Sequence, residues 1–147
     1  MGLKKLLIMV MLSISIIAGL VACSAPSSAP IPGDTRWFLR SYGEQSHLIS
    51  IIEGTEITAT FNSAEGRISG SSGCNTYFAE YEAEDSRLSI SEMAYTEMAC
   101  VSPQGVMKQE QEFLSLLTKT QSFQVDDTSL TITCSDGRQL YFTPASK

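Results

Sequence analysis

Cysteine is the residue type in this 147-residue sequence with the most distinctive chemistry. The chain has four cysteines, Cys23, Cys74, Cys100 and Cys134, and a single histidine, His47. A redox enzyme favours two thiols in a C-x-x-C spacing, which no pair of these cysteines has. A structural zinc site needs four closely spaced ligands, which scattered cysteines and one histidine do not supply. The cysteines therefore point to acylation or disulfide bonding, and we expect no metal site.

The other reactive side chains form no pattern that is typical of catalysis. His47 stands in a polar stretch, and no G-x-S-x-G motif supports a Ser-His-acid triad. Glu80, Glu82 and Glu84 occupy alternate positions, so they share one face of a predicted strand. We interpret them as a solvated outer face that protects a strand edge, with a cation site or a docking patch for a basic partner as the alternative. We expect no catalytic residue, no cofactor and no enzymatic activity.

The N-terminus has the layout of a secretion signal. Lys4 and Lys5 precede an uncharged segment, residues 6–22, that is short for a membrane-spanning helix. The segment ends in L-V-A-C, which resembles the bacterial lipobox, in which the cysteine is acylated and becomes the new N-terminus. We therefore predict a signal peptide over residues 1–22 and a lipid anchor on Cys23. An ordinary cleaved signal and an uncleaved anchor are the alternatives.

The residues after Cys23 predict a spacer and an address. Residues 24–33 contain three of the five prolines and no charge, which is typical of extended chain. We predict a tether over residues 23–34 that stands the domain off the membrane. Ser24, in place of aspartate, resembles lipoproteins that are sent on to an outer membrane. The expected location is the bacterial cell envelope. If the source has two membranes, we expect the protein to be anchored in the outer membrane and to face the periplasm.

Charge excludes one class of partner. The formal charge is −6, and without Lys4 and Lys5 the remaining chain has eight cationic side chains against sixteen acidic ones, a charge of −8. Nucleic acid binding requires a basic surface, so we expect no nucleic acid partner. Residues 35–147 have the length of one domain with a core of its own.

Alternating polarity predicts a mainly β (α+β) fold for this domain, with antiparallel strands. The apolar residues that we assign to inward faces are Trp37, Leu39, Ile57, Ala59, Phe61, Tyr77, Tyr81, Ala83, Leu88, Ile90, Leu130, Ile132, Cys134, Leu140 and Phe142, with a further strand in residues 48–52. The pair Asp136-Gly137 predicts a two-residue turn of a terminal hairpin.

One segment predicts an amphipathic helix that covers the sheet. Ser102 is its expected N-cap and Pro103 its first residue, and apolar residues recur from Val106 to Leu117 at helical spacing. We place Lys108, Gln109, Gln111 and Glu112 on its solvent face.

Two motifs carry a family resemblance. A G-x-x-x-G-x-x-G-C-N-x-Y segment begins at Gly66, and T-x-M-A-C ends at Cys100 just before the helix. Together with the early Trp37 and the terminal hairpin, this order closely resembles the META or HslJ-like domain over residues 36–143. The resemblance implies a compact antiparallel, barrel-like curved sheet with one helix. It also implies frequent occurrence on bacterial lipoproteins, links to stress responses and envelope integrity, and no accepted catalytic site.

The motif residues have a structural and a ligand-binding interpretation. Gly66, Gly70 and Gly73 permit bulges, bends or close backbone approach in a curved sheet, with an anion or ligand nest as the alternative. Asn75 is expected to satisfy backbone groups in that bend, with a ligand contact as the alternative.

In an oxidising envelope the two motif cysteines, Cys74 and Cys100, are the natural disulfide pair, although three pairings are possible after acylation of Cys23. Cys134 alternates with inward apolar residues and is expected to be buried. The leading functional hypothesis is a non-catalytic envelope lipoprotein that binds or supports other envelope components, with an envelope protein as the expected partner. The alternative is a carrier of a small apolar ligand.

Overall fold

The computed structural model describes residues 30–33 and 35–145. The predicted signal peptide, Cys23 and most of the predicted tether lie outside the described residues. In chain order the elements are β1 (Arg36–Glu44), β2 (His47–Ser50), β3 (Thr58–Asn62), β4 (Arg67–Ser71), β5 (Thr76–Glu84), β6 (Arg87–Tyr95), α2 (Val106–Leu117), β7 (Thr120–Val125), β8 (Leu130–Cys134) and β9 (Arg138–Pro144).

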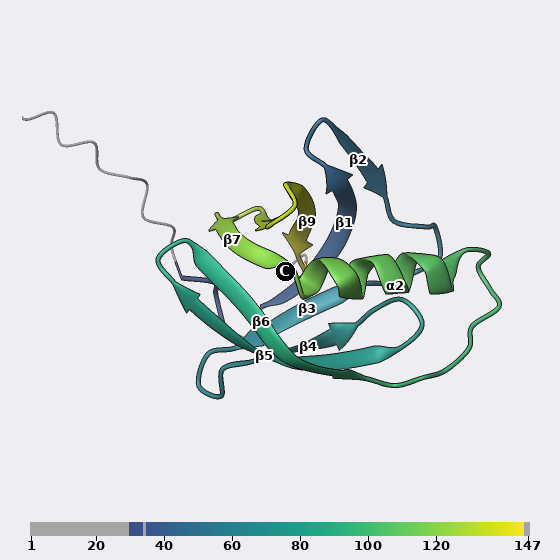
Figure 1. Ribbon diagram of the computed structural model, residues 1–147, viewed down its shortest axis with the longest axis horizontal. Helices are drawn as coiled ribbons and strands as arrows, with labels where there is room; N and C mark the ends of the chain where they lie inside the picture. Colours follow the sequence, from purple (N-terminus) through teal and green to yellow (C-terminus); the bar gives the residue numbers. More distant parts are fainter. Residues whose placement is uncertain (1–29, 34, 146–147) are drawn as a thin grey trace, which may run out of the picture.

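The strands form a closed antiparallel barrel. The order is β2-β1-β3-β4-β5-β6-β7-β8-β9, and β1 also pairs with β9, so eight strands close into a ring with β2 as an extra strand beside β1. After β6, the chain runs outside the barrel before α2 turns back across it toward β7 (Figure 1). The fold confirms the predicted barrel-like sheet with one helix in the described part of the chain.

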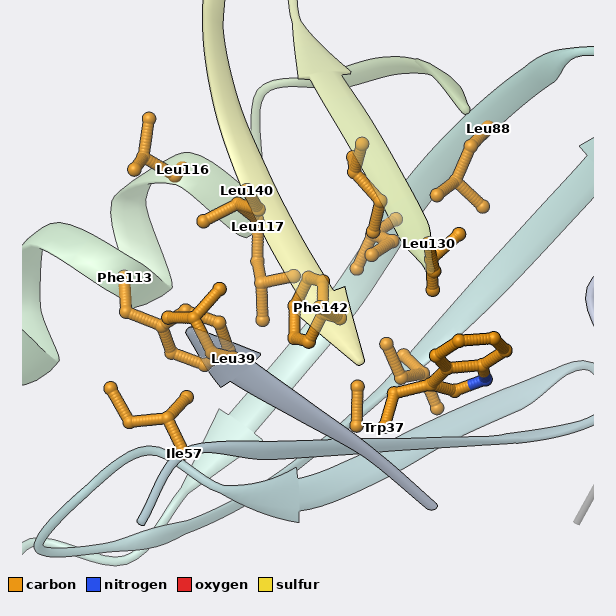
Figure 2. Close-up of a cluster of buried hydrophobic side chains, with 14 of the residues drawn as sticks. Trp37, Leu39, Ile57, Leu88, Phe113, Leu116, Leu117, Leu130, Leu140 and Phe142 are labelled. Carbon is orange, nitrogen blue, oxygen red and sulfur yellow. The ribbon is translucent and has the colours of Figure 1, made fainter. Parts of the chain in front are cut away.

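The barrel interior is filled by large side chains from nearly every strand. Trp37, Phe61 and Phe142 are at most 1% exposed, and Ile57 and Ala59 are fully buried as their alternation predicts. Figure 2 shows Phe113 and Leu117 of α2 directed toward side chains of the strands. Replacing one such aromatic residue by alanine typically costs about 3–5 kcal/mol of stability.

The helix starts later than the sequence predicts. It begins at Val106, and its N-cap is Gly105 with φ of 90° and no capping side chain, so the prediction of Ser102 as N-cap and Pro103 as first helical residue is wrong. The left-handed conformation of Gly105 cannot be part of a right-handed helix, which fixes the boundary there. Within the described ranges, no helix has the length and apolar character needed to cross a bilayer.

Three strand details also differ from expectation. The terminal hairpin is present, but the Gly137 amide donates to the Cys134 carbonyl at 2.9 Å, and Gly137 has φ of 84°. This is a three-residue connection with one left-handed residue, rather than a two-residue turn. Ala83, predicted to face the core, is exposed near the β5–β6 turn, and β2 ends at Ser50 with all four residues exposed.

Candidate functional site

Both sequence motifs converge on one buried carboxylate, that of Glu110 on α2. The Glu110 side chain accepts hydrogen bonds from the Ser72 hydroxyl at 2.6 Å, from the Asn75 backbone and side-chain amides at 2.7 Å each, and from the Cys74 amide at 3.3 Å. Glu110 is 3% exposed. A buried carboxylate with four donors is satisfied without a cation, so it holds the G-C-N bend onto the helix.

Asn75 extends this network to the second motif. Its amide nitrogen also donates to the Met98 carbonyl at 3.1 Å. Its amide oxygen accepts from the Met98 amide at 2.7 Å and from the Thr96 hydroxyl at 2.8 Å. Both hydrogens and both lone pairs of the side-chain amide are therefore used within the chain. The Asn75 side chain satisfies backbone groups and has no donor or acceptor left for a ligand.

Glycines allow the chain to reach this geometry. Gly73 has φ of 113°, a conformation that favours glycine, and it lies between two residues that contact Glu110. A Cβ at Gly70 would lie 2.0 Å from the Thr58 carbonyl oxygen. Strand β4 therefore approaches β3 so closely at this position that only glycine fits. Gly66, with φ of 64°, takes part in the β3–β4 turn. These glycines shape the backbone rather than forming an open nest.

The electrostatics of Glu110 keep it ionised. Burial alone raises the pKa of the Glu110 carboxyl, but the hydrogen bonds from Ser72, Asn75 and Cys74 outweigh burial and hold the pKa below its ordinary value. A carboxylate that is charged and saturated with donors is a poor proton acceptor. The Glu110 network therefore stabilises the fold and has no features of a general base.

Gln109, the neighbouring residue on the helix, anchors a second loop. Its side-chain oxygen accepts from the Ile52 amide at 2.7 Å, and its nitrogen donates to the Thr55 hydroxyl at 3.0 Å. The prediction that Gln109 faces solvent is wrong, since it is 2% exposed. The residue type of Glu110 gives no sign of a site, but Glu110 lies four residues after Val106 and seven before Leu117, which places it on the apolar face.

The three cysteines within the described residues divide as the sequence predicts. Cys74 and Cys100 form a disulfide across 26 residues, which confirms that pairing and ties the G-C-N bend to the end of the second motif. Cys134 is a free, buried thiol, and burial, followed by the nearby Asp136, raises its pKa to about 11. A thiol with that pKa is unreactive at neutral pH.

The remaining acidic and histidine side chains lie apart from this cluster. Glu80, Glu82 and Glu84 are exposed on β5, and Glu84 forms an ion pair with Arg87 at 3.0 Å. His47 is exposed at the start of β2. Among residues 30–33 and 35–145, no group of three His, Cys, Asp or Glu residues is arranged to hold a metal ion.

A groove of about 590 Å³ lies beside the network, between α2 and the end of β6; we call it the α2–β6 groove. Every methionine after Cys23, namely Met93, Met98 and Met107, lines it, and two carboxylates but no lysine or arginine belong to its lining. The complete lining is Asn75, Met93, Tyr95, Thr96, Glu97, Met98, Ala99, Met107, Glu110, Gln111, Leu114, Ser115 and Thr118. Methionine is overused at adaptable binding surfaces, so the clustering of these three was the available sequence signal.

Comparisons with known proteins agree with this fold. The family model described as META domain matches residues 30–147. An NMR structure of a protein from Burkholderia xenovorans is similar at 26% identity and a TM-score of 0.64, covering 85% of this chain and 97% of that one. A second NMR structure, at 20% identity, has a TM-score of 0.57 and covers 76% of this chain and 89% of that one.

A crystal structure of a DUF4847 family protein from Bacteroides vulgatus, at 16% identity and a TM-score of 0.53, covers 74% of this chain and 90% of its own. The last two likenesses concern the fold alone. No curated protein matches the chain. The family model covers most of the chain, including both motifs and the residues around Glu110, and on this match the chain belongs to the META domain family.

Proposed function

We propose that this protein is a lipid-anchored bacterial envelope protein whose META domain binds another envelope component and catalyses no reaction. The α2–β6 groove carries the proposal, because it is an apolar, methionine-lined depression of about 590 Å³ on the described surface. That volume lies within the range of ligand-binding pockets. A part in the envelope stress response is the biological setting that the family resemblance implies.

The state of the polar groups supports binding over catalysis. Glu110 and Asn75 use their hydrogen-bonding capacity within the chain, and Cys134 is buried with a raised pKa. A catalytic site needs a base or nucleophile that can reach a substrate. These three side chains do not meet that need.

The filled interior argues against a carrier that holds its ligand inside the barrel. Trp37, Phe61, Phe123 and Phe142 are at most 2% exposed within the core cluster. A ligand inside the barrel would have to displace these side chains, which is costly in a close-packed interior. The groove on the outside is the better site for a partner.

The proposed anchor is Cys23, and the path of the chain supports attachment at one end of the barrel. Ile31 is 7% exposed and packs in the core cluster, and the cavity around it includes Tyr81 and Phe123. Ile31 lies within the predicted tether of residues 23–34 but packs in the domain core, so we now propose that the tether ends before Ile31. Two or more acyl chains on Cys23 would anchor the protein stably.

Photocrosslinking in cells that produce the full chain tests the binding role. A photoreactive p-benzoylphenylalanine replaces Ser115, which lines the groove, or Lys108, which is exposed on the same helix outside the lining. We expect a discrete adduct from position 115 and none from position 108. Equal labelling at both positions, or no adduct at position 115, contradicts a groove that is occupied in the envelope.

A further inference from the structure

Strand β6 is paired with β7 only at its first residue, Arg87. It pairs with β5 from Arg87 to Tyr95, but its register with β7 consists of one pair, Arg87 with Ser122. The register with β5 shifts between Phe78 and Glu80, opposite Glu92, which has φ of 49°. Pairing with β7 has already ended when the chain reaches this bulge, which redirects the last residues of β6, because bulges increase local twist and bend a strand.

The edge of β6 beyond the bulge has no strand partner among the described residues. The Thr96 amide donates to the Thr76 carbonyl at 3.0 Å, and the Thr76 amide donates to the Thr96 side-chain hydroxyl at 3.2 Å, so the amide of Thr96 points to the β5 side. In an antiparallel ladder the bonding direction alternates, so the amide and carbonyl of Tyr95 point to the opposite edge. An unpaired edge of this kind is a template for another strand.

That edge forms one wall of the α2–β6 groove. Met93 and Tyr95 of β6 line the groove, and Met107 and Leu114 of α2 line the facing side. Tyr95 and Met98 are 50% and 57% exposed, so the two side chains present apolar surface at the groove. An extended segment laid along β6 would gain backbone hydrogen bonds from the edge and apolar contacts from the methionines. A helix would gain only the contacts, since its own backbone groups are already paired.

The acidic side chains at the α2–β6 groove favour a basic peptide segment. The groove lining contains Glu97 and Glu110, the bulge residue Glu92 is exposed nearby, and the lining has no basic side chain. A partner with lysine or arginine at the ends of its strand would be attracted, and an acidic one repelled.

We propose that the α2–β6 groove binds an extended peptide segment of a partner protein by strand addition to β6, with apolar side chains at alternate positions and basic residues at both ends. This inference rests on the proposed binding function and names the class of partner. Recognition of this type takes affinity from main-chain hydrogen bonds and specificity from alternate side chains.

The test uses the acylated full chain in lipid nanodiscs and a library of capped peptides. Each peptide has lysine at both ends and Leu, Ile, Val or Phe at alternate positions between them. We expect the best member to bind with a Kd below about 1 mM. Methylation of alternate backbone nitrogens should weaken it at least about tenfold, because the strand hydrogen bonds are lost. Glutamate ends should weaken it by a similar factor, and binding should protect the Tyr95 amide from hydrogen exchange.

Protein variants provide the matched comparison. Ser115→Trp places a large ring in the groove and should weaken binding at least about tenfold, whereas Lys108→Trp on the exposed face should leave it within about twofold. Absence of binding by every member, or affinity that is indifferent to backbone methylation, would overturn strand addition. If the position-115 crosslink persists in that case, the proposed binding function stands and only the partner class fails.

Discussion

The side-chain amide of Asn75 donates to the carboxylate of Glu110 at 2.7 Å, which joins the G-C-N bend to helix α2 across 35 residues of sequence. The same amide group binds the backbone of Met98, so one asparagine links the first motif, the second motif and the helix. The motif residues by which the family resemblance is recognised thus serve to dock α2, and this docking forms one wall of the α2–β6 groove.

Replacing Glu110 should destabilise the fold more than its position on a helix suggests. In Glu110→Gln the new amide group would face donors from Ser72 and Asn75, which leaves buried groups without acceptors. We expect a loss of about 2–4 kcal/mol in the free energy of unfolding, measured by urea denaturation. Lys108→Ala, on the exposed face, should change it by less than about 0.5 kcal/mol. Equal stability of Glu110→Gln and the wild type would show that the network does not fix the helix.

Acid should weaken the network in a defined direction. The pKa of Glu110 is lower in the folded chain than its ordinary value of 4.5, so its stabilising effect is full above that value and is lost as the pH falls toward the folded pKa. The difference in unfolding free energy between the wild type and Glu110→Gln should therefore shrink below about pH 4.5. Asp126 and Asp136, whose pKa values are also lowered, are present in both proteins and cancel. A difference that is constant from pH 7 to about pH 3 contradicts an ionised Glu110.

Gly70 should tolerate no side chain. The Thr58 carbonyl, 2.0 Å from the Cβ that alanine would add, also accepts the Tyr77 hydroxyl at 2.9 Å, so a shift of this group breaks a buried hydrogen bond. We expect Gly70→Ala to lower the midpoint of urea unfolding by the equivalent of at least about 3 kcal/mol. Gly54→Ala, where φ is 82° but no atom lies within 4 Å, should cost only about 1 kcal/mol of backbone strain. A smaller loss at Gly70 than at Gly54 would rule out the close approach.

Reduction of the disulfide should loosen the motif region. The Cys74–Cys100 bond closes 26 residues, so the chain-entropy model gives about 3.5 kcal/mol of stabilisation. The double variant Cys74→Ser, Cys100→Ser should lose about that amount in thermal or urea unfolding. Cys134→Ala, which removes the free buried thiol, should leave the Cys74–Cys100 peptide in a non-reducing mass map. Recovery of Cys134 in a bridged peptide from the wild type would contradict the pairing.

The sequence predicts local features better than the contacts that connect them. Alternation identifies Ile57, Ala59 and Phe61 as core residues, because a strand with one buried face has period two. The polar type of Gln109 predicts a place on the solvent face, but its hydrogen-bond partners Ile52 and Thr55, more than 50 residues away in sequence, hold it in the interior. The predicted helix start is wrong because proline is a common first helical residue, which favours Pro103, whereas the left-handed conformation of Gly105 delays the start to Val106.

The α2–β6 groove also depends on contacts that local sequence patterns do not reveal. It exists because β6 separates from β7 while α2 returns across the opening, and both depend on pairings along the whole barrel. Three methionines in a 15-residue stretch, from Met93 to Met107, are the sequence trace of this surface.

Mass spectrometry of the native full-length protein tests the central functional claim, anchoring in the envelope, most directly. The proposal predicts a mature N-terminus at Cys23 that carries the mass of acyl chains, together with loss of membrane association in Cys23→Ser. An N-terminus at Met1, or at Cys23 without added mass, would contradict the lipid anchor and with it the envelope setting proposed for the α2–β6 groove.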